Sequence, residues 1–288
     1  MNNSATIPFR KMNGLGNDFV ILDSRVLPIE MTTKNARRIA DRSQGIGCDQ
    51  VIVLEPSDKA DAFMRIYNSD GSEVGACGNA ARCVALILAK EKGRIEVTIE
   101  TQEAVLSAEA TSADRVTIDN GEPRLAWDEI PLAEPFHDTA CIELQIGPID
   151  EPVLHSPSVV NVGNPHAIFW VDDVQAHDLG RFGPLLENHP LFPERANISL
   201  AQITSRSGLK LRTWERGAGL TKACGTAACA AAVSAARKRF TDRKVTVELP
   251  GGPLAIEWTN DNRVLMTGPA EFEFEGALAA DTLSRAQV

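Results

Sequence analysis

Two short phrases headed by a cysteine are the part of this 288-residue sequence best suited to chemistry. Residues 77–83 read CGNAARC, residues 224–229 read CGTAAC, and each phrase opens an alanine-rich, strongly helical stretch. Cys77 and Cys224 would therefore each stand at a helix N-terminus, where unpaired N–H groups and the helix dipole favour a thiolate. A thiolate is a base and a thiol is an acid, so the pair is suited to moving protons.

The reaction predicted for such a pair is inversion of a stereocentre. Inversion removes a proton from one face of a carbon and adds one to the other face, and two identical groups suit a reaction that runs in both directions. Gly78 and Gly225 follow the cysteines directly, and the missing side chain lets backbone N–H groups approach a substrate carboxylate. The sequence therefore predicts an amino-acid epimerase with a small-molecule substrate.

No cofactor or metal is expected for this chemistry. A pyridoxal-phosphate racemase commonly uses a tyrosine base, and Tyr67 is the only tyrosine of the chain. Neither of the common glycine-rich phosphate-binding strings occurs, and no CxxC pair or zinc-finger spacing joins the six cysteines.

One spacing relates the two halves of the chain. The cysteines lie 147 residues apart, since 224 − 77 = 147, and the same offset joins three further pairs of polar residues. These pairs are Asn17 with Asn164, Gln50 with Asn197, and Asn68 with Glu215. Gene duplication explains the shared register. We expect repeat domains at 1–125 and 126–269, a connecting segment near 124–150, residues 270–288 as a candidate completion of the first domain, and an active site in the cleft between the domains.

The predicted elements point to an α+β fold. Alternating apolar runs predict strands at 51–54, 62–67, 94–100 and 105–109, and helices are expected at 78–92, 225–240, 178–189 and from Thr32 toward Ser43. The helices after Cys77 and Cys224 carry small apolar residues on nearly every face, so each must be surrounded. We therefore expect each domain to be a curved, mainly antiparallel sheet wrapped around one central helix.

Composition excludes several other classes. The formal net charge is −10 and the basic residues are scattered, so no nucleic-acid footprint is present. The sequence contains no apolar run long enough for a membrane span and no secretory signal, so a cytoplasmic protein is expected.

The sequence closely resembles the diaminopimelate epimerase family over nearly its whole length. The matching phrases include KMNGLGNDF from Lys11, GIGCDQ from Gly45, GNPHA from Gly163, PERANI from Pro193, and WERGAGLTKACGTAAC from Trp214. The resemblance implies a cofactor-independent enzyme that converts LL-2,6-diaminopimelate to the meso form, in lysine and peptidoglycan precursor biosynthesis. It also implies a homodimer.

The resemblance assigns roles to individual residues. Cys77 and Cys224 are implied to be the paired acid and base, His166 and Glu215 to assist the thiols, and Arg216 to bind the distal carboxylate of the substrate. The implied substrate-binding set is Asn17, Gln50, Asn68, Gly78, Asn79, Asn164, Asn197, Glu215, Arg216, Gly225 and Thr226. Ala80 and Ala227 stand where the family often has glycine, and we interpret them as tolerated variants.

Other interpretations remain for the same residues. A proline or hydroxyproline racemase would share the two-thiol chemistry, although proline has no second carboxylate for Arg216. A thiol peroxidase or redox sensor would use Cys77 and Cys224 as a disulfide couple, and a binding protein would need neither thiol. Cys83, Cys229 and Cys48 are expected to be core residues.

Overall fold

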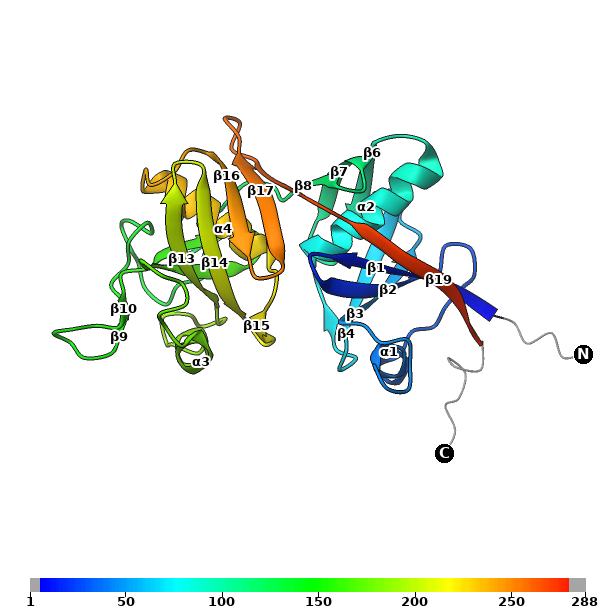
Figure 1. Cartoon of the computed structure of the whole chain (residues 1–288), viewed down its shortest axis with the longest axis horizontal. Coiled ribbons are helices and arrows are strands. Elements are labelled where there is room, and N and C mark those ends of the chain that lie inside the picture. The colour runs from blue at the N-terminus through cyan, green and yellow to red at the C-terminus, as the bar shows by residue number, and fades with distance from the viewer. Residues whose placement is uncertain (1–5, 280–288) are drawn as a thin grey trace, which may run out of the picture. The chain divides into compact units, whose positions relative to one another are not determined.

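The computed structural model describes residues 6–279 and divides the chain into two compact units (Figure 1). Unit 1 comprises Met1–Ile118 with Gly268–Val288, and unit 2 comprises Asp119–Thr267. Residues 280–288, the end of the segment expected to complete the first domain, lie outside the described residues.

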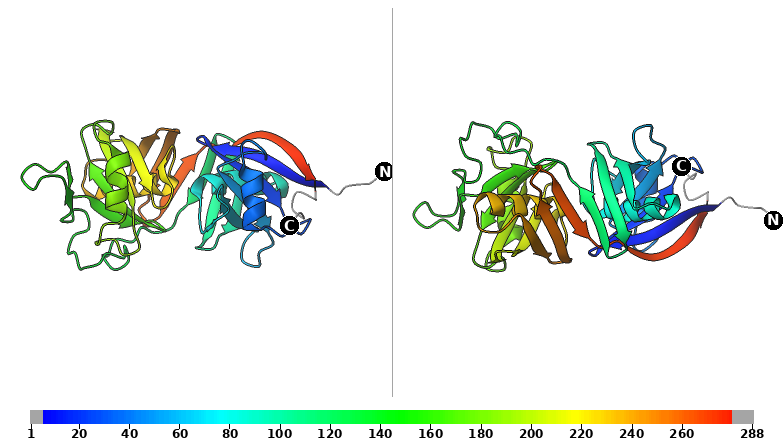
Figure 2. Two further views of the ribbon diagram at one scale, coloured as in Figure 1. Left: turned by 90° about the horizontal axis from the view of Figure 1, so that it is seen from below. Right: turned by 90° about the horizontal axis from the view of Figure 1, so that it is seen from above.

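Unit 1 is built from strands and two helices. Its elements are β1 (Thr6–Gly14), β2 (Asn17–Asp23), α1 (Thr33–Ala40), β3 (Gln50–Glu55), β4 (Ala62–Asn68), β5 (Glu73–Val74), α2 (Gly78–Lys92), β6 (Glu96–Glu100), β7 (Val105–Ser112), β8 (Arg115–Asp119), whose last residue already belongs to unit 2, and β19 (Glu271–Ala279). The late strand β19 pairs antiparallel with the early strand β1, and Figure 2 shows the two side by side.

Unit 2 repeats this plan with further strands. Its elements are β9 (Gln145–Ile146), β10 (Leu154–His155), β11 (Ser158–Asn161), β12 (Pro165–Trp170), α3 (Leu179–Glu187), β13 (Asn197–Ser205), β14 (Gly208–Glu215), β15 (Gly219–Thr221), α4 (Gly225–Arg237), β16 (Lys244–Leu249), β17 (Gly252–Trp258) and β18 (Val264–Gly268), whose last residue lies in unit 1.

Each unit surrounds one apolar helix with strands, as the sequence predicts. Helix α2 contacts β1, β6 and β7, and α4 contacts β11, β12, β13, β14, β16 and β17 (Figure 1). Both helices begin at the predicted residues, directly after Cys77 and Cys224. Cys83 and Cys229, inside these helices, are fully buried, and Cys48 is buried under α1, so all three are core residues as expected.

The strand pairing follows the repeat register. In unit 1, Phe19 of β2 pairs with Gln50 of β3, and in unit 2, His166 of β12 pairs with Asn197 of β13, with the same offset of 147 residues. Both of these pairings are parallel, as are β4 with β6 and β14 with β16. Most of the other pairings, including β1 with β2, β3 with β4, β6 with β7, β13 with β14 and β16 with β17, are antiparallel, so the α+β prediction of mainly antiparallel sheets is confirmed.

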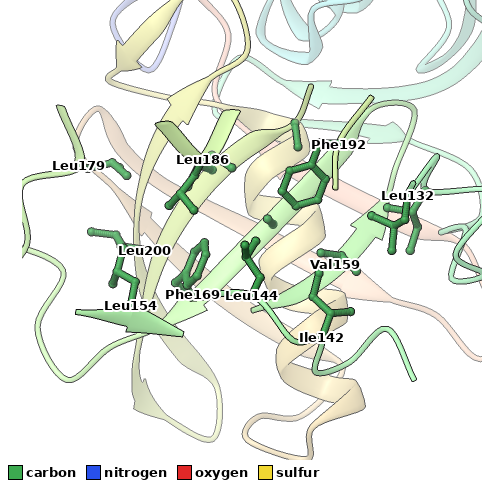
Figure 3. Close-up of a cluster of buried hydrophobic side chains, with 14 of the residues drawn as sticks. Leu132, Ile142, Leu144, Leu154, Val159, Phe169, Leu179, Leu186, Phe192 and Leu200 are labelled. Carbon is green, nitrogen blue, oxygen red and sulfur yellow. The ribbon is translucent and has the colours of Figure 1, made fainter. Parts of the chain in front are cut away.

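The prediction that residues 124–150 form a connecting segment is wrong. Ile130 and Ile142 are each 1% exposed and lie in the core of unit 2. Figure 3 shows Ile142 and Leu144 in this cluster together with Phe169 of β12. The prolines and acidic residues of the segment cover its outer side, while its spaced apolar residues anchor it. It is therefore part of the second fold unit.

Three helices end earlier than predicted, and one of them is α3, which ends at Glu187 two residues before its predicted end. Thr32 caps α1 as expected, since its hydroxyl accepts from the Asn35 amide at 3.2 Å. The helix stops at Ala40 because the Asp41 carboxylate accepts from the Ser43 and Gln44 amides and forms a turn instead. Helix α4 ends at Arg237, three residues before the predicted end at Phe240.

None of the helices within residues 6–279 has the length and hydrophobicity that a membrane span requires.

Candidate active site

The half-site of unit 1 is centred on Cys77, the N-cap residue of α2. The half-buried Cys77 thiol donates to Asn17 Oδ1 at 3.8 Å, and the Asn79 amide donates to the same oxygen at 3.3 Å. Asn17 Nδ2 donates in turn to the Asp49 carboxylate at 3.0 Å, which fixes the amide with its oxygen toward the thiol. Three of the predicted residues are thus in direct contact.

Gln50 and Asn68 form a second pair in unit 1. They are opposite each other on β3 and β4, and Gln50 Nε2 donates to Asn68 Oδ1 at 3.0 Å. Asn68 also donates to the Ser72 hydroxyl at 3.1 Å. The buried Gln50 Oε1 has no hydrogen-bond partner, so it remains an acceptor for a ligand donor.

The half-site of unit 2 is centred on Cys224, the N-cap residue of α4. Cys224 is 5% exposed and its sulfur lies 3.5 Å from the Thr226 hydroxyl. Glu215 lies near enough for its charge to act on the Cys224 thiol, and its carboxylate accepts a short hydrogen bond from the Thr221 hydroxyl. Glu215 ends β14, and the β15 strand that carries Thr221 pairs back onto it.

The electrostatics of Cys224 differ from the sequence expectation of a lowered pKa. Burial, and then the negative charge of Glu215, raise the pKa of Cys224 well above its ordinary value of 9.0. The Thr226 hydroxyl and the Ala227 amide act in the opposite direction and are outweighed. Burial also raises the pKa of Glu215. The thiol is therefore protonated at rest, with a carboxylate beside it that can accept the proton.

Gly225 allows close packing against Met266, in addition to its proposed role in binding the substrate carboxylate. A Cβ at this position would lie 2.7 Å from the Met266 sulfur. A side chain here would push Met266 aside, so glycine lets the first turn of α4 approach β18 closely.

His166 lies in the same unit, on β12, and is fully buried. Its Nε2 is 2.7 Å from Asn164 Oδ1, an atom that only accepts, so Nε2 carries the hydrogen and Nδ1 keeps a lone pair. Nδ1 is buried without a hydrogen-bond partner. Burial, and then the charge of Arg216, lower the pKa of His166 to about 3, so the ring is neutral at physiological pH.

Asn197 and Arg216 complete the half-site of unit 2. The Asn197 amide is buried, donates to Pro165 O at 3.0 Å and accepts from the Arg216 backbone N–H at 3.0 Å. Arg216 Nη1 donates to Glu194 O at 2.9 Å. Asn197 therefore holds backbone segments, and the other guanidinium donors of Arg216 are available for an anion.

Sequence reasoning missed the side chains that hold these residues. Asp49 orients Asn17, Ser72 orients Asn68, and Thr221 bonds to Glu215. Asp49 and Thr221 lie inside the family phrases GIGCDQ and WERGAGLTKACGTAAC, which was the signal available. Among residues 6–279, no group of three or more His, Cys, Asp or Glu side chains is placed to hold a metal ion.

Solved structures of low sequence identity share this fold. A hydroxyproline epimerase from Agrobacterium vitis has a TM-score of 0.67 at 15% identity, covering 98% of this chain and 94% of that one. A PhzF-family phenazine biosynthesis protein from Bacillus anthracis has a TM-score of 0.64 at 16% identity, covering 95% and 99%. The fold is therefore that of the epimerase-like α+β proteins.

Sequence comparison identifies the family within this class. The model of the family described as diaminopimelate epimerase matches residues 9–126 and 158–273. A diaminopimelate epimerase of Rhodopseudomonas palustris (strain TIE-1) is 60% identical over 93% of this chain and 92% of the relative. That of Nitrobacter hamburgensis is 56% identical over 96% of each. The chain belongs to the diaminopimelate epimerase family.

Proposed function

We propose that this chain, an isomerase, converts LL-2,6-diaminopimelate to meso-diaminopimelate without a cofactor, in lysine and peptidoglycan precursor biosynthesis. The observation that carries the proposal is the identity of 56–60% to relatives named diaminopimelate epimerase, over at least 92% of each chain. The site residues of both units support it, because each unit supplies one cysteine at the start of a buried helix.

The proposed mechanism uses Cys77 and Cys224 on opposite faces of one α-carbon. The thiolate of one cysteine takes the α-proton and becomes a thiol, while the thiol of the other gives its proton to the opposite face and becomes a thiolate. The carboxylate next to the α-carbon gains enolate character on the way, and the N–H groups of Gly78, Asn79, Gly225 and Thr226 are proposed to stabilise that charge.

Glu215 and His166 are proposed to accept protons from the cysteine thiols and to return them. Glu215 lies beside Cys224, and the raised pKa values of both groups suit a pair that shares one proton. When Cys224 must act as base, Glu215 accepts its proton first. The neutral His166 ring, with its free Nδ1 lone pair, is proposed to assist the thiols as a further proton acceptor.

Substrate selection is assigned to the polar residues around the two cysteines. Arg216 is proposed to bind the distal carboxylate, since guanidinium groups bind carboxylates through two parallel hydrogen bonds. The remaining proposed substrate-binding residues are Asn17, Gln50, Asn68, Asn164 and Asn197. In the structure Asn197 acts through the Arg216 backbone, so its proposed contribution includes positioning. A homodimer and a cytoplasmic location also belong to this proposal, and they rest on the family.

Incubation of the protein in heavy water with single amino acids tests the substrate. We expect LL-diaminopimelate to become meso-diaminopimelate with deuterium at the inverted α-carbon, and no exchange into proline or trans-4-hydroxyproline. Deuteration of proline or hydroxyproline without exchange into diaminopimelate would overturn the proposal and favour the racemases that share this fold.

A further inference from the structure

The buried carboxylate of Glu187 binds the residues on either side of Glu215 and Arg216. These two residues are the ones proposed to accept the thiol proton and to bind the distal carboxylate of the substrate. Glu187, the last residue of α3, is 5% exposed. Its Oε2 accepts from Trp214 Nε1 at 2.7 Å, and its Oε1 accepts from the Gly217 backbone N–H at 3.0 Å. Trp214 directly precedes Glu215, and Gly217 directly follows Arg216. Glu187 therefore holds both ends of the Glu215–Arg216 dipeptide.

The backbone of α3 also contacts Trp214 directly. Gly183 lies one helical turn before Glu187, and a Cβ at this position would lie 2.4–2.8 Å from atoms of the Trp214 side chain. The Trp214 ring therefore packs directly on the α3 backbone while its Nε1 reaches Glu187. Helix α3 fixes this residue by shape and by hydrogen bonding together.

The buried carboxylate of Glu187 accepts hydrogen bonds from three donors. Besides Trp214 and Gly217, it accepts from Arg195 Nη1 at 3.1 Å, and Arg195 is half exposed. A buried carboxylate is tolerated only when donors compensate for its lost hydration, so the three donors explain how Glu187 remains in place. Hydrogen bonds to a charged group are also the strong ones, which suits a group that must resist movement of the loop.

We propose that Glu187 is a positioning residue of the epimerase reaction, acting through Trp214 and Gly217. It sets where the Glu215 carboxylate stands against the Cys224 thiol and where the Arg216 guanidinium meets the distal carboxylate. This inference rests on the proposed function, which assigns those two tasks. Glu187 itself touches neither the substrate nor the reacting sulfur.

The test compares Glu187→Gln, Trp214→Phe and Arg195→Gln. Glutamine has one acceptor oxygen in place of two, so it cannot accept from both Trp214 and Gly217. Phenylalanine keeps a smaller ring near Gly183 and removes the Nε1 donor together with part of the indole. The Arg195 variant is the matched control, because it removes a half-exposed charge from the same carboxylate and leaves both loop contacts in place.

We expect Glu187→Gln to raise KM for diaminopimelate about tenfold or more and to lower kcat by a similar factor. Trp214→Phe should change both constants in the same direction by a smaller factor, and Arg195→Gln should stay within about twofold of wild type. A purely structural role would reduce the folded fraction, which lowers apparent kcat without moving KM. Wild-type KM in folded Glu187→Gln or in Trp214→Phe would overturn the proposal.

A second readout separates this inference from the proposed function. Deuterium exchange of the Gly217 amide and the NMR signal of the Trp214 indole N–H report the loop directly, whatever the substrate is. We expect Gly217 to exchange at least about tenfold faster in Glu187→Gln. Unchanged protection would contradict the positioning role, whereas absence of diaminopimelate turnover by wild type would contradict only the proposed function and the catalytic part of this inference.

Discussion

Cys77 and Cys224 look equivalent in the sequence, and their surroundings differ. The half-buried Cys77 thiol faces the neutral amide oxygen of Asn17. Cys224 is buried beside the Glu215 carboxylate, which together with burial raises its pKa. A carboxylate opposes the charge of a neighbouring thiolate unless the carboxylate takes the proton itself. In the proposed mechanism, the two thiols therefore act in different electrostatic surroundings.

The buried neutral His166 should make stability depend on pH. Its pKa falls from 6.5 to about 3 on folding, so between these values the unfolded chain binds a proton that the folded chain does not. The free energy of unfolding therefore decreases as pH falls below about 6.5, by at most about 1.4 kcal/mol per pH unit. Urea unfolding at several pH values between 4 and 6.5 measures this slope.

His166→Gln provides the control for that measurement. Glutamine retains a donor for Asn164 and does not titrate, so we expect the slope between pH 4 and 6.5 to be lower in the variant than in wild type. Carboxyl groups with lowered pKa values, such as Asp18 and Asp61, start from 3.8 and act below this window. Equal slopes in the two proteins would show that His166 is accessible to protons in the folded state.

At the scale of elements, the helices behind the cysteines are held by buried polar contacts as well as by packing. Arg82 of α2 is fully buried. Its Nη2 donates to Asn79 Oδ1 at 3.0 Å, and its Nε donates to Pro269 O at 3.0 Å, just before β19. The helix that carries Cys77 is thus joined to the late strand of unit 1 by one side chain.

Replacement of Arg82 by leucine should destabilise unit 1 strongly. Leucine leaves the Asn79 and Pro269 oxygens without this donor in a buried place, and we expect a loss of about 3 kcal/mol in the free energy of unfolding. Chemical denaturation measures the loss. Arg82→Lys keeps a charge and part of the hydrogen bonding, so it should lose less. Equal stability of Arg82→Leu and wild type would mean that these contacts contribute nothing net.

The helices themselves were predictable from the sequence, and their surroundings were not. The span of α2 follows from an alanine-rich run that ends at Gly93, which adopts a left-handed conformation at the C-cap. The sequence also predicts that Cys224 begins a helix. It does not reveal that Glu215 lies against the thiol, because that contact depends on β15 folding back onto β14. Burial, and then the charge of Glu215, raise the pKa of Cys224, so the predicted downward shift is wrong.

At the scale of the whole molecule, the repeat is the feature that the sequence predicts best. The offset of 147 residues reappears in the pairing of β2 with β3 and of β12 with β13. A constant offset survives folding because equivalent residues occupy equivalent places in each unit. The parallel direction of those pairs and the burial of Ile130 and Ile142 arise from contacts between distant segments, and local sequence patterns do not encode them.

Unit 2 should fold by itself because Asp119–Thr267 is continuous in the chain and contains its own apolar core. We expect the fragment 119–267 to unfold in one cooperative thermal transition, measured by circular dichroism. The fragment 151–267 is the matched control, since it lacks Ile130 and Ile142 of that core and should show no cooperative transition. Cooperative folding of the shorter fragment would contradict the place given to residues 124–150.

The central claim is that Cys77 and Cys224 each serve one face of a single α-carbon. The most direct measurement is the conversion of LL-diaminopimelate in heavy water by wild type, Cys77→Ala and Cys224→Ala, with folding of each variant verified by circular dichroism. Loss of either proton carrier should lower the rate of stereoinversion at least about 100-fold in both variants, while wild type forms the meso product with deuterium from the solvent. Inversion at the wild-type rate by either folded variant would contradict the two-thiol account.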